Sequence, residues 1–482
     1  MLRIWNGGAD LTSSSVTKWV DDNADRLIEL CDEIWRYAEP GLIEFESAEA
    51  LATELEDNGF EVERGVAGMP TAFVASFGTG SPVIGILGEY DALPGLTQKV
   101  SAEKEPFESG AAGHGCGHNL LGVGALGAAI AIKEAMVDHN IEGTIKYFGC
   151  PAEETLVGKV FMARDGFFDD LDAALTWHPF SFNAVMASSS LALNSVKFNF
   201  HGVSSHAAAN PEAGRSALKA AQLMDTGVHY MREHVAQEAR IHSVITEGGG
   251  EPNVVPPESQ IWYYVRAPRR QSVDEIYSWI LDIAKGAALM TGTTYDIEFL
   301  VGCSNVVVNN TLNELLSKRL EEVGAPQYND ADQEFADKLV ATFKPGQAAM
   351  ITRAFGLPEE FATIVLHEDT AGILGEGKVM PGSTDVGDVS WVTPTAQFGT
   401  CCSPFGTAGH SWQQTAASGS GIGHRGTLIA AKVLALAGLD LLTDSDLLER
   451  ARREFEDGLN TRGVYKPPIP ADLAPPLDLL KH

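Results

Sequence analysis

The segment His114-Gly115-Cys116-Gly117-His118 places two imidazoles and one thiol close together in the chain. Cysteine thiolate and neutral histidine are both good ligands for Zn²⁺ and similar divalent ions. The glycine on each side of Cys116 lets the backbone bend closely around an ion. A glycine-rich turn with incidental His and Cys side chains would give the same letters, so this segment alone leaves both interpretations open.

Two adjacent carboxylates follow a β-like run, in Pro151-Ala152-Glu153-Glu154. One carboxylate of such a pair can bind a metal ion while the other takes the proton of an activated water. The run Ala173–Trp177 ends in His178. Ligands bind at the carboxyl ends of strands in open α/β sheets, so Glu153, Glu154 and His178 are expected to converge. A solvated acidic pair and a hydrogen-bonded core histidine are the structural alternatives.

Two further polar residues could join this group. His410 lies in the glycine-rich run Gly406-Thr407-Ala408-Gly409-His410, where it fits as a fifth ligand of a paired-metal site. Asp91 follows the buried run Val83–Leu87 and could orient a ligand histidine by a hydrogen bond. Considered alone, His410 is better explained as a structural loop residue, and Asp91 is explained equally well as a turn-forming aspartate.

Alternating helices and strands must position these residues. Helical spacing of apolar residues occurs within residues 17–58 and again from His118 to about Glu134. The β-rich runs between and after them are Phe60–Glu63, Ala72–Phe77, Val83–Leu87, Thr144–Gly149 and Ala173–Trp177. This alternation predicts an α/β catalytic domain with a mostly parallel central sheet flanked by helices.

The pattern changes near Leu193. Residues 194–305 predict a strand–helix–strand–strand–helix–strand order, which is an α+β, ferredoxin-like arrangement. We therefore expect an inserted domain between two parts of the catalytic domain, residues 1–193 and 306–482. In the second part we expect helices over the ranges Leu312–Val323, Ile422–Leu436 and Ser445–Gly458, and a loop over Gly382–Trp391.

Composition narrows the classes of function. Of 482 residues, 44% are hydrophobic and 21% are charged, which is ordinary for a globular protein. The formal net charge of −31 argues against nucleic acid or an anionic membrane as the main partner. Residues 1–15 lack the apolar core of a secretory signal, and the longest apolar stretch, Leu120–Ile132, is shorter than the roughly 20 residues that span a bilayer. The six cysteines form no paired framework, so we expect a reducing, cytoplasmic compartment.

Several motifs occur together in one order along the chain. They are Gly-Glu-Tyr-Asp-Ala-Leu-Pro at 88–94, His-Gly-Cys-Gly-His-Asn at 114–119, Pro-Ala-Glu-Glu at 151–154, Thr-Trp-His-Pro at 176–179, Ser-His-Ala-Ala at 205–208 and Gly-His-Ser-Trp at 409–412. In this order the chain resembles the dinuclear metallopeptidase family of aminoacylases, carboxypeptidase G-type enzymes and auxin-conjugate amidohydrolases. The resemblance covers essentially the whole chain. The run 383–391 strengthens the likeness to the branch that contains B-type p-aminobenzoyl-glutamate hydrolase chains.

The resemblance implies a role for each matching residue. The metal ligands would be Cys116, His118, Glu154, His178 and His410. Glu153 would be the general base, with Asp91 behind the ligands. His206 would reach a neighbouring chain's active site and polarise the scissile carbonyl, because the inserted domain is the family's dimerisation domain. Asn253 and Arg266 match positions near the substrate carboxylate, which the planar guanidinium of arginine suits.

The implied activity is hydrolysis of the amide bond of an N-acyl amino acid, with p-aminobenzoyl-glutamate as the first substrate. N-acyl-aspartates and auxin conjugates are alternatives, as is a non-catalytic partner chain of a hetero-oligomeric hydrolase. The resemblance implies two divalent ions per chain. Asn119 and Cys116 stand where many relatives carry carboxylates, so Mn²⁺ and Zn²⁺ both stay open. A homodimer or a heterodimer with a related A-type chain is the implied assembly, and neither nucleic acid nor a membrane is expected.

Overall fold

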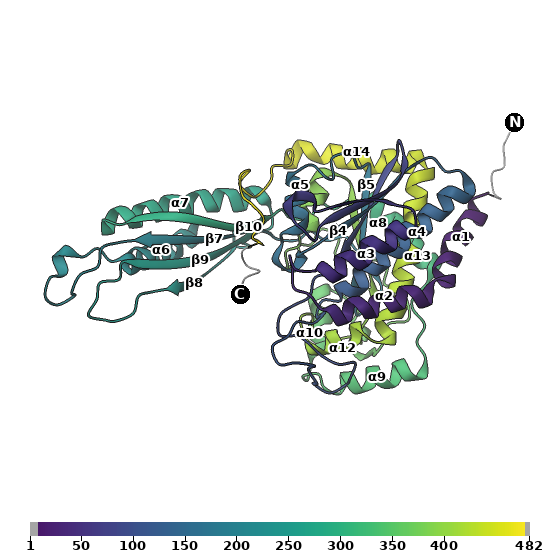
Figure 1. The fold of residues 1–482 in the computed structure, drawn as a ribbon, viewed down its shortest axis with the longest axis horizontal. Helices are drawn as coiled ribbons and strands as arrows, with labels where there is room; N and C mark the ends of the chain where they lie inside the picture. The colour runs from purple at the N-terminus through teal and green to yellow at the C-terminus, as the bar shows by residue number, and fades with distance from the viewer. Residues whose placement is uncertain (1–7, 478–482) are drawn as a thin grey trace.

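The computed structural model describes residues 8–477 and shows two bodies joined side by side (Figure 1). The larger body contains an eight-stranded sheet, and the smaller one projects from it as a four-stranded sheet with two helices. The expected lack of a signal segment concerns residues 1–15, of which 1–7 lie outside the described residues.

The elements follow in chain order. The α-helices of the larger body are α1 (Gly8–Asp22), α2 (Ala24–Tyr37), α3 (Phe45–Asp57), α4 (His118–His139), α5 (Gly158–Arg164), α8 (Asn310–Val323), α9 (Asp330–Val340), α10 (Gln347–Phe355), α11 (Val386–Val392), α12 (Trp412–Ser418), α13 (Gly421–Thr443) and α14 (Ser445–Arg462). Its strands are β1 (Glu61–Arg64), β2 (Phe73–Thr79), β3 (Val83–Glu89), β4 (Gly143–Cys150), β5 (Ala173–Phe180), β6 (Ala184–Met186), β11 (Ile373–Leu374) and β12 (Thr395–Cys401).

The large sheet is parallel at its centre. Its strand order is β1-β2-β4-β3-β5-β12-β6-β11, and β4, β3, β5 and β12 run parallel to their neighbours within that group. β1, β2 and β6 pair antiparallel towards the two edges. The predicted α/β class with a mostly parallel central sheet is therefore confirmed, and the carboxyl ends of the four central strands open on the same edge.

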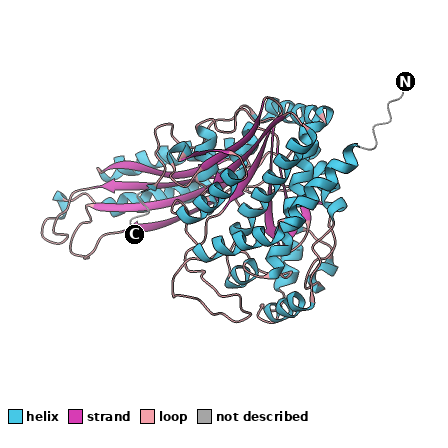
Figure 2. Ribbon diagram, turned by 45° about the vertical axis from the view of Figure 1, so that its right-hand side comes forward, coloured by secondary structure: helices cyan, strands magenta, loops and turns pink. Residues whose placement is uncertain are grey.

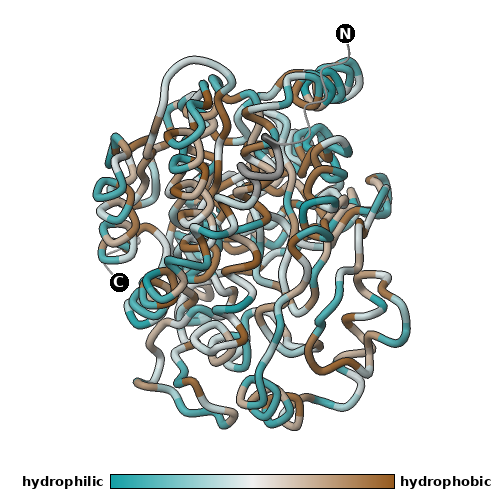
Figure 3. Tube along the Cα trace, turned by 90° about the vertical axis from the view of Figure 1, so that its right-hand side faces the viewer, coloured by the Kyte–Doolittle hydropathy of each residue, from teal (hydrophilic) through white to brown (hydrophobic). Residues whose placement is uncertain are grey.

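Two long apolar helices, α4 and α13, pack against one face of this sheet. Both are long and apolar enough to cross a membrane by composition, yet most of each is buried inside the larger body, as a core helix is. Figure 2 shows the helices enclosing the sheet, and Figure 3 shows hydrophobic segments gathered towards its centre. A Cβ at Gly124 of α4 would lie 2.8 Å from the Trp177 ring, so glycine lets α4 approach β5 closely. The Trp177 indole donates a hydrogen bond to Leu121 O at 3.0 Å and fixes that approach.

The smaller body is the predicted inserted fold. Its elements are β7 (Ala192–His201), α6 (Ala217–Met231), β8 (Arg240–Glu247), β9 (Glu258–Ala267), α7 (Arg270–Thr291) and β10 (Thr294–Cys303). The strand order β10-β7-β9-β8, with every pair antiparallel, is the ferredoxin-like order. α6 and α7 pack on the sheet through buried apolar side chains, and β8 forms an edge of the sheet.

One expected loop is wrong. The sequence predicts a loop over residues 382–391, but the second half of this segment forms α11. The reason is tertiary contact: Asp388 accepts hydrogen bonds from the Ser304 amide and hydroxyl, each at 2.9 Å. A Cβ at Gly387 would lie 2.1 Å from Ser304 O, so glycine serves close packing there and not a flexible turn. Helices α9, α10 and α12 are further elements that the sequence patterns do not predict.

Candidate metal centre

Cys116 and His118 lie where a bent loop enters α4. Gly117 between them has φ +83°, a left-handed conformation that glycine adopts without strain, and His118 is the first residue of the helix. The Nδ1 of the fully buried His118 donates a hydrogen bond to Asp91 Oδ1 at 2.7 Å. This hydrogen bond places the proton of the neutral ring on Nδ1 and leaves Nε2 as the free ligand atom.

Glu153 and Glu154 lie at the carboxyl end of β4 in a strained turn. Ala152 before them has φ +55°, which is costly for a residue with a Cβ. The buried Glu44 carboxylate accepts the Ala152 amide at 2.8 Å and so holds this turn in place. The Glu154 amide donates to Asp91 Oδ2 at 2.9 Å. Asp91 therefore connects the turn to the ligand ring of His118.

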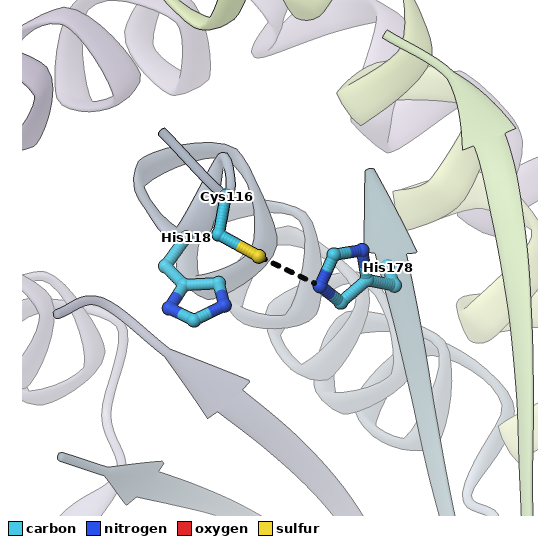
Figure 4. A group of neighbouring side chains, drawn as sticks. All are labelled: Cys116, His118 and His178. Atoms are coloured by element: carbon cyan, nitrogen blue, oxygen red, sulfur yellow. Dashed lines mark hydrogen bonds between the residues drawn. The ribbon is translucent and has the colours of Figure 1, made fainter. Parts of the chain in front are cut away.

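His178 and His410 approach from the other two central strands. His178 lies on β5 with its Nε2 3.4 Å from Cys116 Sγ (Figure 4). His410 lies on the loop that follows β12, and its φ is +55°. Its Nε2 lies 3.2 Å from Glu154 Oε2. The His410 backbone amide donates a hydrogen bond to Gly115 O at 2.9 Å. This backbone hydrogen bond holds the loop that carries His410 against the loop that carries Cys116.

The donor atoms form two groups that share one thiol. In the first, Cys116 lies with His118 and His178, and in the second it lies with Glu154 and His410; within each group all donor atoms are within 4.8 Å of one another. Buried polar atoms are normally hydrogen-bonded, but His118 Nε2 and Glu154 Oε1 are buried without a partner. Cys116, His118, Glu154, His178 and His410 would hold two divalent ions, and bound ions would give His118 Nε2 and Glu154 Oε1 the partners that they lack. The residues present therefore fit a paired-metal centre.

The electrostatics of the site point the same way. Burial raises the pKa of the Cys116 thiol to about 12 and lowers the pKa of His178 to about 4. Burial also raises the pKa of Glu153 well above its usual range, with further contributions from the Glu89 and Asp385 charges. Bound cations reverse this preference, because a coordinating thiol is deprotonated outright. The Cys116 thiol and the Glu153 carboxyl thus need external positive charge to ionise, whereas the His178 ring stays neutral and free to bind a metal.

A cavity of about 720 Å³ opens from these residues towards the inserted domain. Its wall includes Cys116, Glu153, Glu154, His178 and His410, together with Tyr264 and Arg266 of β9. Arg266 Nε is buried without a hydrogen-bond partner, and no carboxylate among residues 14–477, whose side chains the structure describes, lies within ion-pair distance of this guanidinium. An unpaired cation that faces a cavity suits an anionic ligand.

The structure thus gathers Cys116, His118, Glu154, His178, His410, Glu153, Asp91 and Arg266, but not His206 or Asn253. Arg266 pairs with Leu193 at the inner end of the smaller sheet, whereas His201 pairs with Glu258 at its outer end. The eight-residue distance between these pairs is roughly 25–30 Å of strand. His206 follows β7 and Asn253 precedes β9, so both lie on loops beyond this outer end, and the Ala207 amide donates a hydrogen bond to Asn253 O between the two loops.

Three residues near the centre had no predicted role. Glu89 Oε2 lies 3.4 Å from His118 Nε2, and its other oxygen lies 2.7 Å from Lys159 Nζ. Asp385 binds the same ammonium at 2.5 Å. Glu89 is the last residue of β3, two residues before Asp91, and this position at a strand end could have identified it as a candidate site residue. Lys159 and Asp385 carry no such local signal. His114, by contrast, is structural, since its Nε2 contacts Ile34 O at 3.0 Å.

Comparison with known proteins agrees with this geometry. Residues 85–370 match the model of peptidase family M20/M25/M40. The chain is 40% identical to the B-type chain of p-aminobenzoyl-glutamate hydrolase from Escherichia coli K12, over 95% of this chain and 98% of that protein. It is 29% identical to the Xaa-Arg dipeptidase of Mus musculus, over 93% of each chain. Other relatives are named as the A-type chain of p-aminobenzoyl-glutamate hydrolase or as its homolog.

A solved structure shares the fold. It is a dinuclear metal binding peptidase of the M20 family from Bacillus subtilis, with a TM-score of 0.55 and 16% identity. The alignment covers 88% of this chain and 99% of that one. The matched family model spans more than half of the chain, and the E. coli relative matches nearly all of it. This chain therefore belongs to peptidase family M20/M25/M40 and is a metal-dependent amide hydrolase.

Proposed function

We propose that this enzyme hydrolyses N-acyl amino acids, with p-aminobenzoyl-glutamate as the first candidate substrate. The observation that carries the proposal is one cavity that contains both the candidate metal ligands and the unpaired guanidinium of Arg266. Its volume is within the usual range for a small-molecule site. The activity for which the E. coli relative is named supports the choice of acyl group and amino acid.

The substrate's two ends find different surroundings. Arg266 stacks on Tyr264, with 5.4 Å from its Cζ to the ring centre, and offers its free N–H groups to a carboxylate. Phe180 and Phe355 line the same cavity, and Phe180 lies 5.1 Å from the His178 ring. An aromatic acyl group gains from such a wall because ring pairs attract beyond simple burial. Charge at one side and aromatic surface at another suit an aromatic acyl amino acid.

Glu153 is the proton carrier of the proposed reaction. Two divalent ions, when bound, supply Lewis-acid activation of water and of the amide carbonyl. Glu153 accepts the proton of the attacking water and returns it to the leaving amine. Asp91 keeps His118 in the tautomer that presents Nε2. Zn²⁺ and Mn²⁺ are both retained as metals, since thiolate and imidazole favour the first and carboxylate accepts the second.

We infer that a second chain completes the site. His206 is exposed, and its Nδ1 accepts the Ala208 and Ala209 amides at 3.2 and 3.1 Å. The neutral ring therefore carries its proton on Nε2, which makes that atom a hydrogen-bond donor. A donor of this kind can stabilise the charge that develops on the carbonyl oxygen. The partner is a second copy of this chain or a related A-type chain.

The proposed compartment is the cytoplasm. All six cysteines are free in the structure, and five of them are buried. Free thiols persist in reducing compartments. Fractionation of the native host, with the protein followed by antibody, tests this point: recovery in the membrane or an oxidising compartment would contradict it.

A hydrolysis screen tests the substrate proposal. The purified chain is loaded with Mn²⁺ or Zn²⁺ and offered p-aminobenzoyl-glutamate, the matching aspartate, an indole-3-acetyl-aspartate conjugate and a dipeptide ending in arginine. We expect the highest kcat/KM for p-aminobenzoyl-glutamate and the lowest for the arginine dipeptide, which carries a cation where the other substrates carry a second carboxylate. Preference for the basic dipeptide would overturn the substrate assignment. Lack of turnover with every substrate in the isolated chain, and its appearance only with an A-type chain, would favour the non-catalytic alternative.

A further inference from the structure

A buried lysine lies directly behind the metal centre. Lys159 belongs to α5, and its side chain is fully enclosed. Its ammonium is 2.7 Å from Glu89 Oε1 and 2.5 Å from Asp385 Oδ1. The Lys159 amide also donates to Asp385 Oδ2 at 2.9 Å, so Asp385 holds both the backbone and the side chain. Neither carboxylate is more than slightly exposed.

Glu89 lies between this lysine and the candidate metal ligand His118. Its free oxygen, Oε2, is 3.4 Å from His118 Nε2, the ligand atom that Asp91 leaves available. Glu89, His118 and Glu153 also offer donor atoms within 4.8 Å of one another. Glu89 is nevertheless absent from both donor groups that share Cys116. Its carboxylate could therefore reach a bound metal ion, although the five candidate ligands do not include it.

Two cations therefore compete for one buried carboxylate. A buried charge must be paired, and Glu89 can pair with Lys159 or turn towards a bound ion. A catalytic metal needs an open position for water or substrate, which an added carboxylate would fill. We propose that Lys159 is a positioning residue that keeps Glu89 out of the coordination shell and so preserves this open position. The proposal rests on the paired-metal site and is independent of the substrate's identity.

The variant Lys159→Met tests the proposal, because methionine keeps much of the volume and removes the charge. We expect two ions still bound per chain, about 10–10³-fold lower kcat, as for loss of a group that shapes the transition state, and little change in KM. X-ray absorption of the Zn²⁺-loaded variant should show one additional oxygen neighbour compared with the wild type. In Glu89→Gln/Lys159→Met the extra neighbour should disappear and kcat should recover to the level of Glu89→Gln.

Two further variants keep the outcome decisive. Arg319→Met removes another ion pair, with Asp440, which lies on α8 and α13 away from the cavity; it should lower stability without changing kcat or the coordination number. Glu89→Gln alone tests the proposal even if Lys159→Met does not fold. We expect it to retain both ions and the wild-type coordination number. Loss of an ion from Glu89→Gln would show that Glu89 is a ligand and would overturn the proposal. A kcat of the double variant as low as that of Lys159→Met would also overturn it.

Discussion

The carboxyl edge of the large sheet and the outer tip of the small one carry functional residues in opposite conditions. At the sheet edge, His118, Glu89 and Asp91 are buried, and each polar group is fixed by a neighbour or left facing the metal positions. At the tip, His206 and Asn253 are exposed on loops and are not among the residues that line the cavity. The first region is an assembled site, whereas the two residues of the second lie away from the cavity of their own chain.

This difference is the basis of the proposal that two chains share the reaction. The buried region can hold metal ions and carry a proton within one chain, because all its groups meet at one edge. The tip lies roughly 25–30 Å of strand from the inner end of its own sheet. It can therefore act on a second chain's cavity without distorting its own domain. Substitutions in either region test this proposal.

The largest effect is expected inside the buried region. Glu153→Gln removes the proton acceptor while keeping the shape of the side chain, so turnover should fall by about 10²–10⁴-fold. Bound metal should stay at the wild-type level, since Glu153 belongs to neither donor group that shares Cys116. Steady-state kinetics together with metal analysis measures both. A variant with full metal and wild-type turnover would remove Glu153 from the account.

The next effect concerns the tip. His206→Ala should lower kcat by about 10²–10³-fold through loss of one donor to the carbonyl oxygen. If the two regions belong to different chains, mixing His206→Ala with Glu153→Gln chains should restore part of the activity. The matched control mixes either variant with itself. The division between chains is wrong if the mixed sample, shown by native mass to contain both chains, stays as inactive as its components.

A smaller effect is expected where the two domains meet. Arg266→Met should raise KM by about 10–100-fold, corresponding to the roughly 1.5–3 kcal/mol of a hydrogen bond to a charged group. The change in kcat should be smaller, and Arg266→Lys should recover only part of the loss, because an ammonium lacks the planar fork. Substrates esterified at the carboxylate provide the control. Equal losses for acid and ester would contradict carboxylate binding by Arg266.

The smallest effect concerns an exposed pair on the inserted sheet. Hydrogen bonds and charge from Asp296, followed by Glu258, raise the pKa of His201 above its usual value. A raised folded-state pKa means that this stabilisation is fully present below about pH 6.5 and is lost as pH rises through the folded value. His201→Gln should therefore lower the free energy of unfolding by less than about 1 kcal/mol at pH 5.5 and leave it unchanged at pH 9. Denaturant titrations at both pH values measure this, and an equal loss at both would contradict it.

Local patterns predicted most of the catalytic scaffold. The parallel strands are predicted by short apolar runs in the sequence. Candidate site residues come at the ends of these runs: Glu153 follows β4, and His178 follows the apolar run Ala173–Trp177 of β5. Because parallel strands end on one edge, this placement alone predicted that these side chains converge. The ferredoxin-like fold of the inserted segment could also be predicted from the sequence, because its four strands and two helices occur in one uninterrupted segment.

Contacts between distant segments could not be predicted in this way. Asp385 lies 226 residues from Lys159, and Glu44 lies 108 residues from Ala152, whose strained turn it holds. Neither pair has a local pattern, because its energy depends on burial created by the finished fold. The helix α11 was missed for the same reason: its Asp388 is fixed by Ser304 from the end of the inserted domain. The positioning of the site, more than its ligands, thus depends on tertiary structure.

The paired-metal centre is the feature on which all of the proposed chemistry depends. The most direct test removes metal by prolonged chelation and then titrates Zn²⁺ or Mn²⁺ into the apo-protein while activity and bound metal are both measured. We predict no hydrolysis without metal and full recovery only when two ions per chain are bound, because two donor groups share Cys116. Activity that survives metal removal, or that saturates at one ion per chain, would contradict the account.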